Sequence, residues 1–91
     1  MKLKQGIIIS EINGEFVAVP SGQASKNFNG MIRMNKTAAF IAKMLQNGAT
    51  EQQVVDAICQ DYDVAREIAC EDYRTVIEQF EQLNLIDHDA T

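Results

Sequence analysis

The first third of the chain has the short apolar runs that are typical of β-strands. Residues 7–12 and 15–19 are rich in β-branched and aromatic side chains. Between them, Asn13-Gly14 supplies the two positive-φ positions of a type I′ hairpin turn. This two-residue turn sets Ile12 opposite Glu15, and the register leaves apolar residues on both faces. We therefore expect a tight hairpin whose second face is partly covered by something other than the helices, in the monomer or in a complex.

A short third strand is expected after a long polar stretch. Pro20 ends the second strand because proline has no amide to donate, and residues 21–30 are mostly polar. The run Met31-Ile32-Arg33-Met34 then predicts a strand that stops at Asn35. Counting back from Asn35, Ile32 and Met34 share one face of this strand, while Met31 and Arg33 share the other.

From Asn35 onward the apolar period becomes helical. Asn35 suits an N-cap, and the apolar stripe that follows predicts a helix over about residues 36–47, with Gly48 just beyond its end. Thr50 is a second N-cap, with Gln53 placed to complete a capping box. The second helix is expected to end near Tyr62.

A third helix is expected over about residues 65–83. Its core-facing positions share one side of the helix and are Ala69, Tyr73, Val76, Ile77 and Phe80. Asn84 suits a left-handed cap, after which Leu85-Ile86 is expected to return to the core. Residues 87–91 are expected to fray, because chain ends are usually poorly ordered.

The element order is therefore three strands followed by three helices (βββααα). A compact chain satisfies this order by stacking one small antiparallel sheet on a three-helix unit, which predicts an α+β, winged-helix-like fold. The length of 91 residues suits one domain spanning residues 1–91.

The charge balance narrows the range of partners. Thirteen acidic residues against eight basic ones give a net charge of −5 at pH 7. An acidic surface repels nucleic acid and anionic membranes, so neither is expected as a partner.

No apolar run approaches the roughly 20 residues that a membrane span needs. Because Ser10 and Glu11 interrupt the first apolar stretch too soon for a secretion signal, we expect a cytoplasmic protein.

Side chains suited to catalysis are scarce. The single histidine, His88, lies among the last few residues, where a solvated tail is expected. Cys59 and Cys70 are expected on different helices as reduced, partly packed thiols. The sequence contains no metal-ligand motif and no phosphate-binding loop, so we expect no metal, no cofactor and no catalytic residues.

An ordered series of residues over about positions 30–87 carries a family resemblance. The series is Met34-Asn35-Lys36-Thr37-Ala38-Ala39-Phe40-Ile41, Leu45, Gly48, Thr50, Val54, Ile58, Tyr62, Asp63-Val64, Asp72-Tyr73, Phe80 and Leu85-Ile86. It resembles the PqqD-like family, which is named for a small protein of pyrroloquinoline quinone biosynthesis. Ala42 stands where many relatives have tryptophan, and Asn84 stands where glycine is usual.

What the resemblance implies is a RiPP recognition element. Such a module is noncatalytic, binds the leader part of a ribosomally made precursor peptide and presents the rest to a modifying enzyme such as a radical SAM maturase. The leader adds as a strand to the third strand of the sheet and lies against the third helix. Carried onto this sequence, the peptide-binding residues are Met31, Ile32, Arg33 and Met34 of the strand, and Ala69, Tyr73 and Ile77 of the helix.

Plainer roles for these residues remain open. Met31 and Met34 also suit a core, Arg33 also suits a solvated charge, and Tyr73 also suits a packed ring with its hydroxyl at the surface.

Two other functions also remain open. A winged-helix DNA-binding regulator is one alternative, although the expected second helix has no base and the third has only Arg66 and Arg74. A structural or dimerising subunit is another, and the two apolar faces of the hairpin leave a homodimer open.

Overall fold

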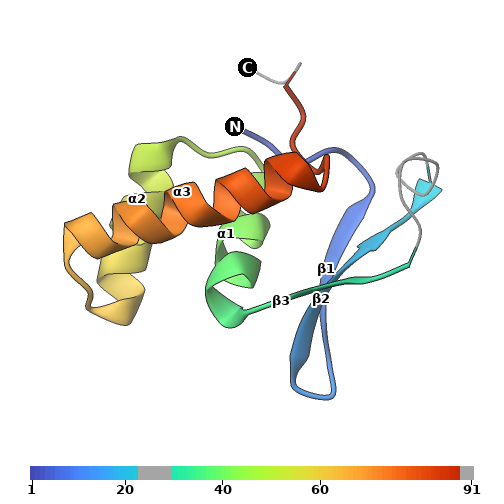
Figure 1. Cartoon of the computed structure of the whole chain (residues 1–91), viewed down its shortest axis with the longest axis horizontal. Coiled ribbons are helices and arrows are strands. Elements are labelled where there is room, and N and C mark those ends of the chain that lie inside the picture. Colours follow the sequence, from blue (N-terminus) through green and yellow to red (C-terminus); the bar gives the residue numbers. More distant parts are fainter. Residues whose placement is uncertain (23–29, 89–91) are drawn as a thin grey trace.

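The computed structural model describes residues 1–22 and 30–88, in which a three-stranded sheet lies beside three helices (Figure 1). The elements are β1 (Ile7–Ile12), β2 (Glu15–Pro20), β3 (Ile32–Met34), α1 (Lys36–Gln46), α2 (Glu51–Tyr62) and α3 (Arg66–Gln82). The expected order of three strands and three helices is confirmed, with each helix boundary within a residue of its predicted place. Most of the long polar stretch, residues 23–29, lies outside the described residues.

The hairpin forms in the predicted register. Ile12 pairs with Glu15, and Asn13 and Gly14 between them both have positive φ values, of 54° and 82°. A type I′ turn needs this backbone shape at both central positions, and its twist matches that of the flanking strands. The sheet order is β1-β2-β3, with antiparallel pairing throughout. The pairing of β1 and β2 runs one residue further than expected, since Pro20 lies opposite Ile7.

The two faces of the hairpin differ in burial. On the helix side, Ile7 and Ala18 are buried and belong to the main core. On the other side, Ile8 and Ile12 are each about half exposed, whereas Val17 is buried. The expected cover of this second face is therefore not seen over Ile8 and Ile12 among residues 1–22 and 30–88.

Side-chain caps start the first two helices. Asn35 Oδ1 accepts a hydrogen bond of 2.8 Å from the Ala38 amide at the start of α1. At the start of α2, Thr50 Oγ1 accepts from the Gln53 amide at 3.1 Å, and Gln53 Oε1 accepts from the Thr50 amide at 2.9 Å. This is the predicted capping box, which satisfies two of the amides that a helix start leaves without partners.

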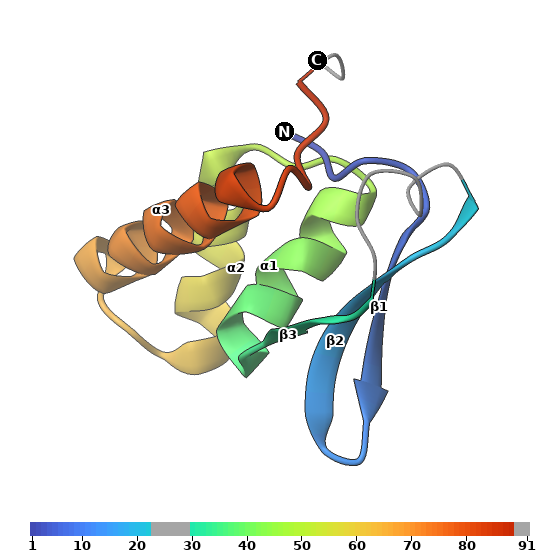
Figure 2. The ribbon, with the colours of Figure 1, turned by 45° about the vertical axis from the view of Figure 1, so that its right-hand side comes forward.

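A strap formed by the N-terminal residues closes the core, and the sequence pattern did not predict it. Leu3 is buried and forms a β-bridge with Ile86. Its amide donates to the Leu45 carbonyl at 3.0 Å, and the Lys4 amide donates to the Leu85 carbonyl at 2.9 Å. The first residues of the chain accordingly run beside the described segment that follows α3 in both ribbon views (Figure 2). The strap ties the end of α1 to the segment that follows α3.

The C-terminal segment behaves only partly as expected. Asn84 takes the predicted left-handed backbone, with φ 61°, and Leu85 and Ile86 are buried. The Asp87 amide donates to the Lys2 carbonyl at 2.9 Å, so the strap holds the chain at this residue. Residues 89–91 of the expected frayed tail lie outside the described residues.

We predict that Thr50→Ala destabilises the fold. Removing the hydroxyl leaves the Gln53 amide without its acceptor, which costs about 1 kcal/mol and lowers Tm by roughly 4–8 °C. Thermal unfolding followed by circular dichroism measures this change. Gln52→Ala, an exposed change in the first turn of the same helix, is the matched control. Equal Tm values for the two variants would contradict the role of the cap.

Leu3→Ala tests the strap. Truncating this buried side chain is expected to lower the free energy of unfolding by about 2–5 kcal/mol, because it removes apolar contacts and leaves a cavity. Denaturant titration gives the value. The control is Ile12→Ala, where a half-exposed apolar side chain is truncated and a change below about 1 kcal/mol is expected. A small effect at Leu3 would mean that the strap is dispensable.

Candidate functional site

Strand β3 lies at an edge of the sheet. Among the described residues it pairs only with β2, with Phe16 opposite Met34 and Ala18 opposite Ile32. Its other side presents backbone amides and carbonyls that no described strand occupies. Such an edge is a template on which an extended chain can form main-chain hydrogen bonds.

The side chains of β3 alternate as the sequence predicts. Ile32 and Met34 are half-buried and pack against the core cluster, whereas Arg33 points to solvent on the opposite face. Arg33 Nε lies 3.6 Å from Glu15 Oε2 in an exposed ion pair. Met31 precedes the strand and is more than half exposed. The edge therefore has an apolar, core-facing side and a charged outer side.

The helix face expected to meet a peptide lies mainly in the core. Ala69 is fully buried, Tyr73 is 4% exposed, and Ile77 is half-buried against the core cluster. The Tyr73 hydroxyl lies 3.8 Å from Met1 Sδ, under the N-terminal strap. Burial raises the pKa of Tyr73, and the nearby Glu51 carboxylate raises it further. In this structure Ala69 and Tyr73 hold α3 in place and offer almost no surface to a peptide.

Two ion pairs show which flank of α3 is turned toward α2. Arg66 Nη1 lies 2.6 Å from Asp56 Oδ1, and Arg74 Nε lies 3.8 Å from Glu51 Oε1. Both acids belong to α2, so the flank of α3 that carries the two arginines is turned toward α2. The pKa of Arg66 is raised by the hydrogen bond that its guanidinium donates to Asp56 and by the negative charge of that carboxylate. Exposed pairs of this kind contribute little stability, about 0–1 kcal/mol each, but they show which flank is occupied.

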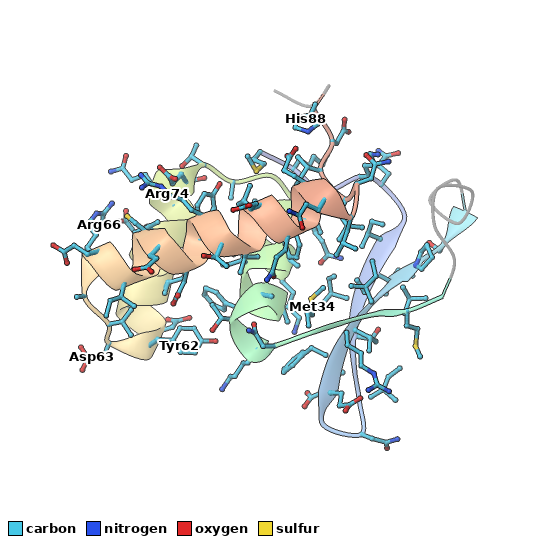
Figure 3. All side chains as sticks on the ribbon, in the orientation of Figure 1. Met34, Tyr62, Asp63, Arg66, Arg74 and His88 are labelled. Carbon is cyan, nitrogen blue, oxygen red and sulfur yellow. The ribbon has the colours of Figure 1, made fainter. Side chains whose placement is uncertain are left out.

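The opposite flank of α3 carries exposed apolar side chains. A helix turns about 100° per residue, which places Ile68, Asp72 and Gln79 on the side away from the two arginines. In Figure 3 Arg66 and Arg74 lie along the upper side of α3, and Met34 lies below the helix. This side of α3 carries Ile68, 52% exposed, in the first turn, and Leu83, 42% exposed, follows the end of the helix. The sequence analysis considered only the core-facing residues of α3 and missed this flank. Ile68 and Leu83, two large apolar residues outside the core-facing set, could have indicated it.

Groups suited to catalysis do not converge in the described part of the chain. No set of three or more His, Cys, Asp or Glu side chains within residues 1–22 and 30–88 could hold a metal ion. His88 is exposed and lies 2.8 Å from Glu81 Oε2. Cys59 and Cys70 are free thiols, half-buried on α2 and α3, as expected. Within the same residues, no helix is long and apolar enough to cross a membrane.

A small α+β module with a strand edge that no described strand occupies belongs to the class of proteins suited to holding an extended peptide. Comparison with protein families gives the particular family. The model of the family described as Coenzyme PQQ synthesis protein D (PqqD) matches residues 15–86, so the chain belongs to this family.

Two solved structures share the fold. The chain of TbiB1 in complex with the TbiA(beta) leader peptide has a TM-score of 0.75 and 22% identity, with 100% of both chains covered. Lasso peptide synthetase B1 complexed with the leader peptide has a TM-score of 0.69 and 19% identity, with 92% of this chain and 93% of that chain covered. Comparison with curated protein sequences gave no match.

Proposed function

We propose that this protein is a RiPP recognition element. It binds the leader part of a ribosomally made precursor peptide as an added strand on β3 and presents the rest of the peptide to a modifying enzyme. The observation that carries the proposal is the edge of β3 that no described strand occupies, in a chain of this family. The two solved structures with this fold, each in complex with a leader peptide, support it.

The surface on both sides of the edge suits this role. Main-chain hydrogen bonds along β3 give affinity for any extended chain, and side-chain pockets give selectivity. Ile32 and Met34 offer an apolar floor on the core side, and the flank of α3 with Ile68 offers an apolar wall. Methionine suits such a floor because its unbranched thioether repacks around different guests.

The protein acts without chemistry of its own in this proposal. Its job is to hold the leader, and catalysis belongs to a partner enzyme for which a radical SAM maturase is our first candidate, as the family resemblance implies.

A homodimer through the half-exposed Ile8 and Ile12 on the outer face of the sheet is compatible with leader binding at β3. The molar mass in solution, measured by light scattering, decides between monomer and dimer.

The DNA-binding alternative is less well supported. A recognition helix needs bases that are free to reach phosphates and base edges. Helix α2 carries none, and both arginines of α3 are engaged with acids of α2. A gel shift with a steep salt dependence would be needed to revive this reading.

The leading prediction is binding of a leader peptide at β3. The probe is the leader of a short precursor peptide identified among the neighbouring genes, added to ¹⁵N-labelled protein. We expect micromolar or tighter binding, with the largest amide shifts at residues 31–34 and along α3, because new hydrogen bonds form there. Shifts confined to β1, the other edge of the sheet, would contradict the proposal, as would the absence of binding.

The flank of α3 is tested by Ile68→Ala. If Ile68 contacts the leader, truncation removes buried apolar surface worth about 1–2 kcal/mol, and the Kd rises roughly tenfold. The matched control is Ile8→Ala, because Ile8 is also half exposed, 48% against 52%, but lies on the outer face of β1. Calorimetric titration of the leader gives both affinities. An unchanged Kd for Ile68→Ala would remove this flank from the site.

Arg33→Glu tests the charge on β3. The reversal is expected to weaken an acidic leader several-fold and to leave Tm unchanged, because the ion pair with Glu15 is exposed. Calorimetric titration and thermal unfolding measure the two quantities. If the leader affinity does not change, Arg33 lies outside the site.

A further inference from the structure

A hollow opens at the end of β3, where the chain enters α1. It has a volume of about 390 Å³ and lies among the hairpin tip, Phe16, Arg33 and Met34. A second hollow of about 130 Å³ shares Phe16 and Lys36 with the first and extends along α1 to the end of α2. We call the two together the basic–aromatic cleft. Its basic and aromatic lining residues are Phe16, Arg33, Lys36, Phe40, Lys43 and Tyr62, and one acid, Glu15, also lines it.

The aromatic rings of the cleft are held in place by packing. Phe40 and Tyr62 meet edge to face, with ring centroids 5.5 Å apart, and both are half-buried against the core. Lys36 Nζ lies 5.8 Å from the centroid of the Tyr62 ring, and Lys43 Nζ lies 5.6 Å from that of Phe16. The lysine side chains are exposed, so their ammonium groups remain open to a ligand.

Positive charge in the cleft is poorly compensated. Among the ion pairs of the described residues, neither Lys36 nor Lys43 has a carboxylate partner, and only Arg33 is paired, with Glu15. Helix α1 begins at Lys36 with no acid in its first turn, so the positive end of its dipole adds to this field.

Charge is segregated along the whole chain. The first 50 residues hold six bases and two acids, whereas residues 51–91 hold two bases and eleven acids. The cleft therefore lies in the basic half of a protein whose net charge is −5.

We propose that the basic–aromatic cleft binds an acidic segment of the precursor peptide that lies N-terminal to the strand added on β3. The inference rests on the proposed function. A peptide paired with β3 leaves the sheet at Met34, which lines the cleft. All pairings in the sheet are antiparallel, and an added strand that continues this pattern has its N-terminal flank at Met34. Carboxylates of that flank meet Lys36 and Lys43, and an apolar or aromatic neighbour packs on the rings.

A short capped probe tests the cleft independently of strand addition. Ac-Glu-Asp-Tyr-Glu-amide is titrated into the full-length ¹⁵N-labelled protein, with Ac-Gln-Asn-Tyr-Gln-amide as its neutral counterpart. We expect amide shifts at Phe16, Lys36, Phe40, Lys43 and Tyr62 with the acidic probe, and binding roughly tenfold weaker with the neutral one. Equal binding of both probes, or no shifts in the cleft, would overturn the proposal.

Matched variants separate a specific site from general attraction. Lys36→Glu and Lys43→Glu should each weaken the acidic probe at least about fivefold, whereas Lys4→Glu, the same change of charge on the N-terminal strap, should leave it unchanged. Equal losses for all three would overturn the cleft as the site. In a further titration, inorganic phosphate replaces the acidic probe at the same concentration. Amide shifts equal to those caused by the peptide would contradict the proposal, because they would show an anion site with no preference for peptide.

The direction of the peptide is read from two chimeras. The acidic tetrapeptide is joined either to the N-terminus or to the C-terminus of the leader used above. Only the N-terminal fusion should bind more tightly than the leader alone. Tighter binding of the C-terminal fusion only would contradict the proposed direction of the peptide. If the leader does not bind at β3 but the short acidic probe still binds in the cleft, the result counts against the proposed function alone.

Discussion

Asn35 links the sheet to the helices, and its side chain accepts a hydrogen bond from the Ala38 amide that caps α1. Asn35 ends β3 directly after Met34 and starts α1 at Lys36, so one capped residue fixes both the end of the edge strand and the start of the helix. The half-buried side chains of Met34 and Ile32 on one side of this junction, and the first turn of α1 on the other, then have little freedom. Both the strand edge and the cleft beside it depend on this residue.

An exposed edge that accepts a peptide also invites unwanted pairing, and β3 limits that risk. The strand is only three residues long, and its central residue is an arginine turned to solvent. Short edges and charged side chains are the usual protection against edge-to-edge aggregation. Three residues supply few main-chain hydrogen bonds, so an occupant needs further contacts. The basic–aromatic cleft includes Met34 at the end of the strand, where such contacts can form.

Local interactions explain why most of the fold could be predicted from the sequence. Asn13-Gly14 encodes the hairpin, and Asn35 and Thr50 encode two helix starts, because each acts within a few residues of itself. The strap was missed because the Leu3 bridge to Ile86 joins the two ends of the chain, and no local pattern encodes such a contact. The core-facing side of α3 was predicted correctly, but the sequence did not show that burial leaves Ala69 and Tyr73 almost no surface for a peptide. Periodicity identified Ala69 and Tyr73 as one face, and that face is the core.

Net charge alone gives an incomplete account of which peptides the protein can bind. At a distance, a chain of net charge −5 repels an acidic peptide, which slows association. Within the screening length of about 8 Å at physiological salt, the local charges decide, and at the end of β3 three bases, Arg33, Lys36 and Lys43, outnumber the one acid, Glu15. A peptide with acids only near its N-terminal flank is attracted by the local bases. The rest of its length carries no acids, so it is not repelled by the acidic helices. Charge segregation along this chain therefore favours a direction of binding as well as a composition.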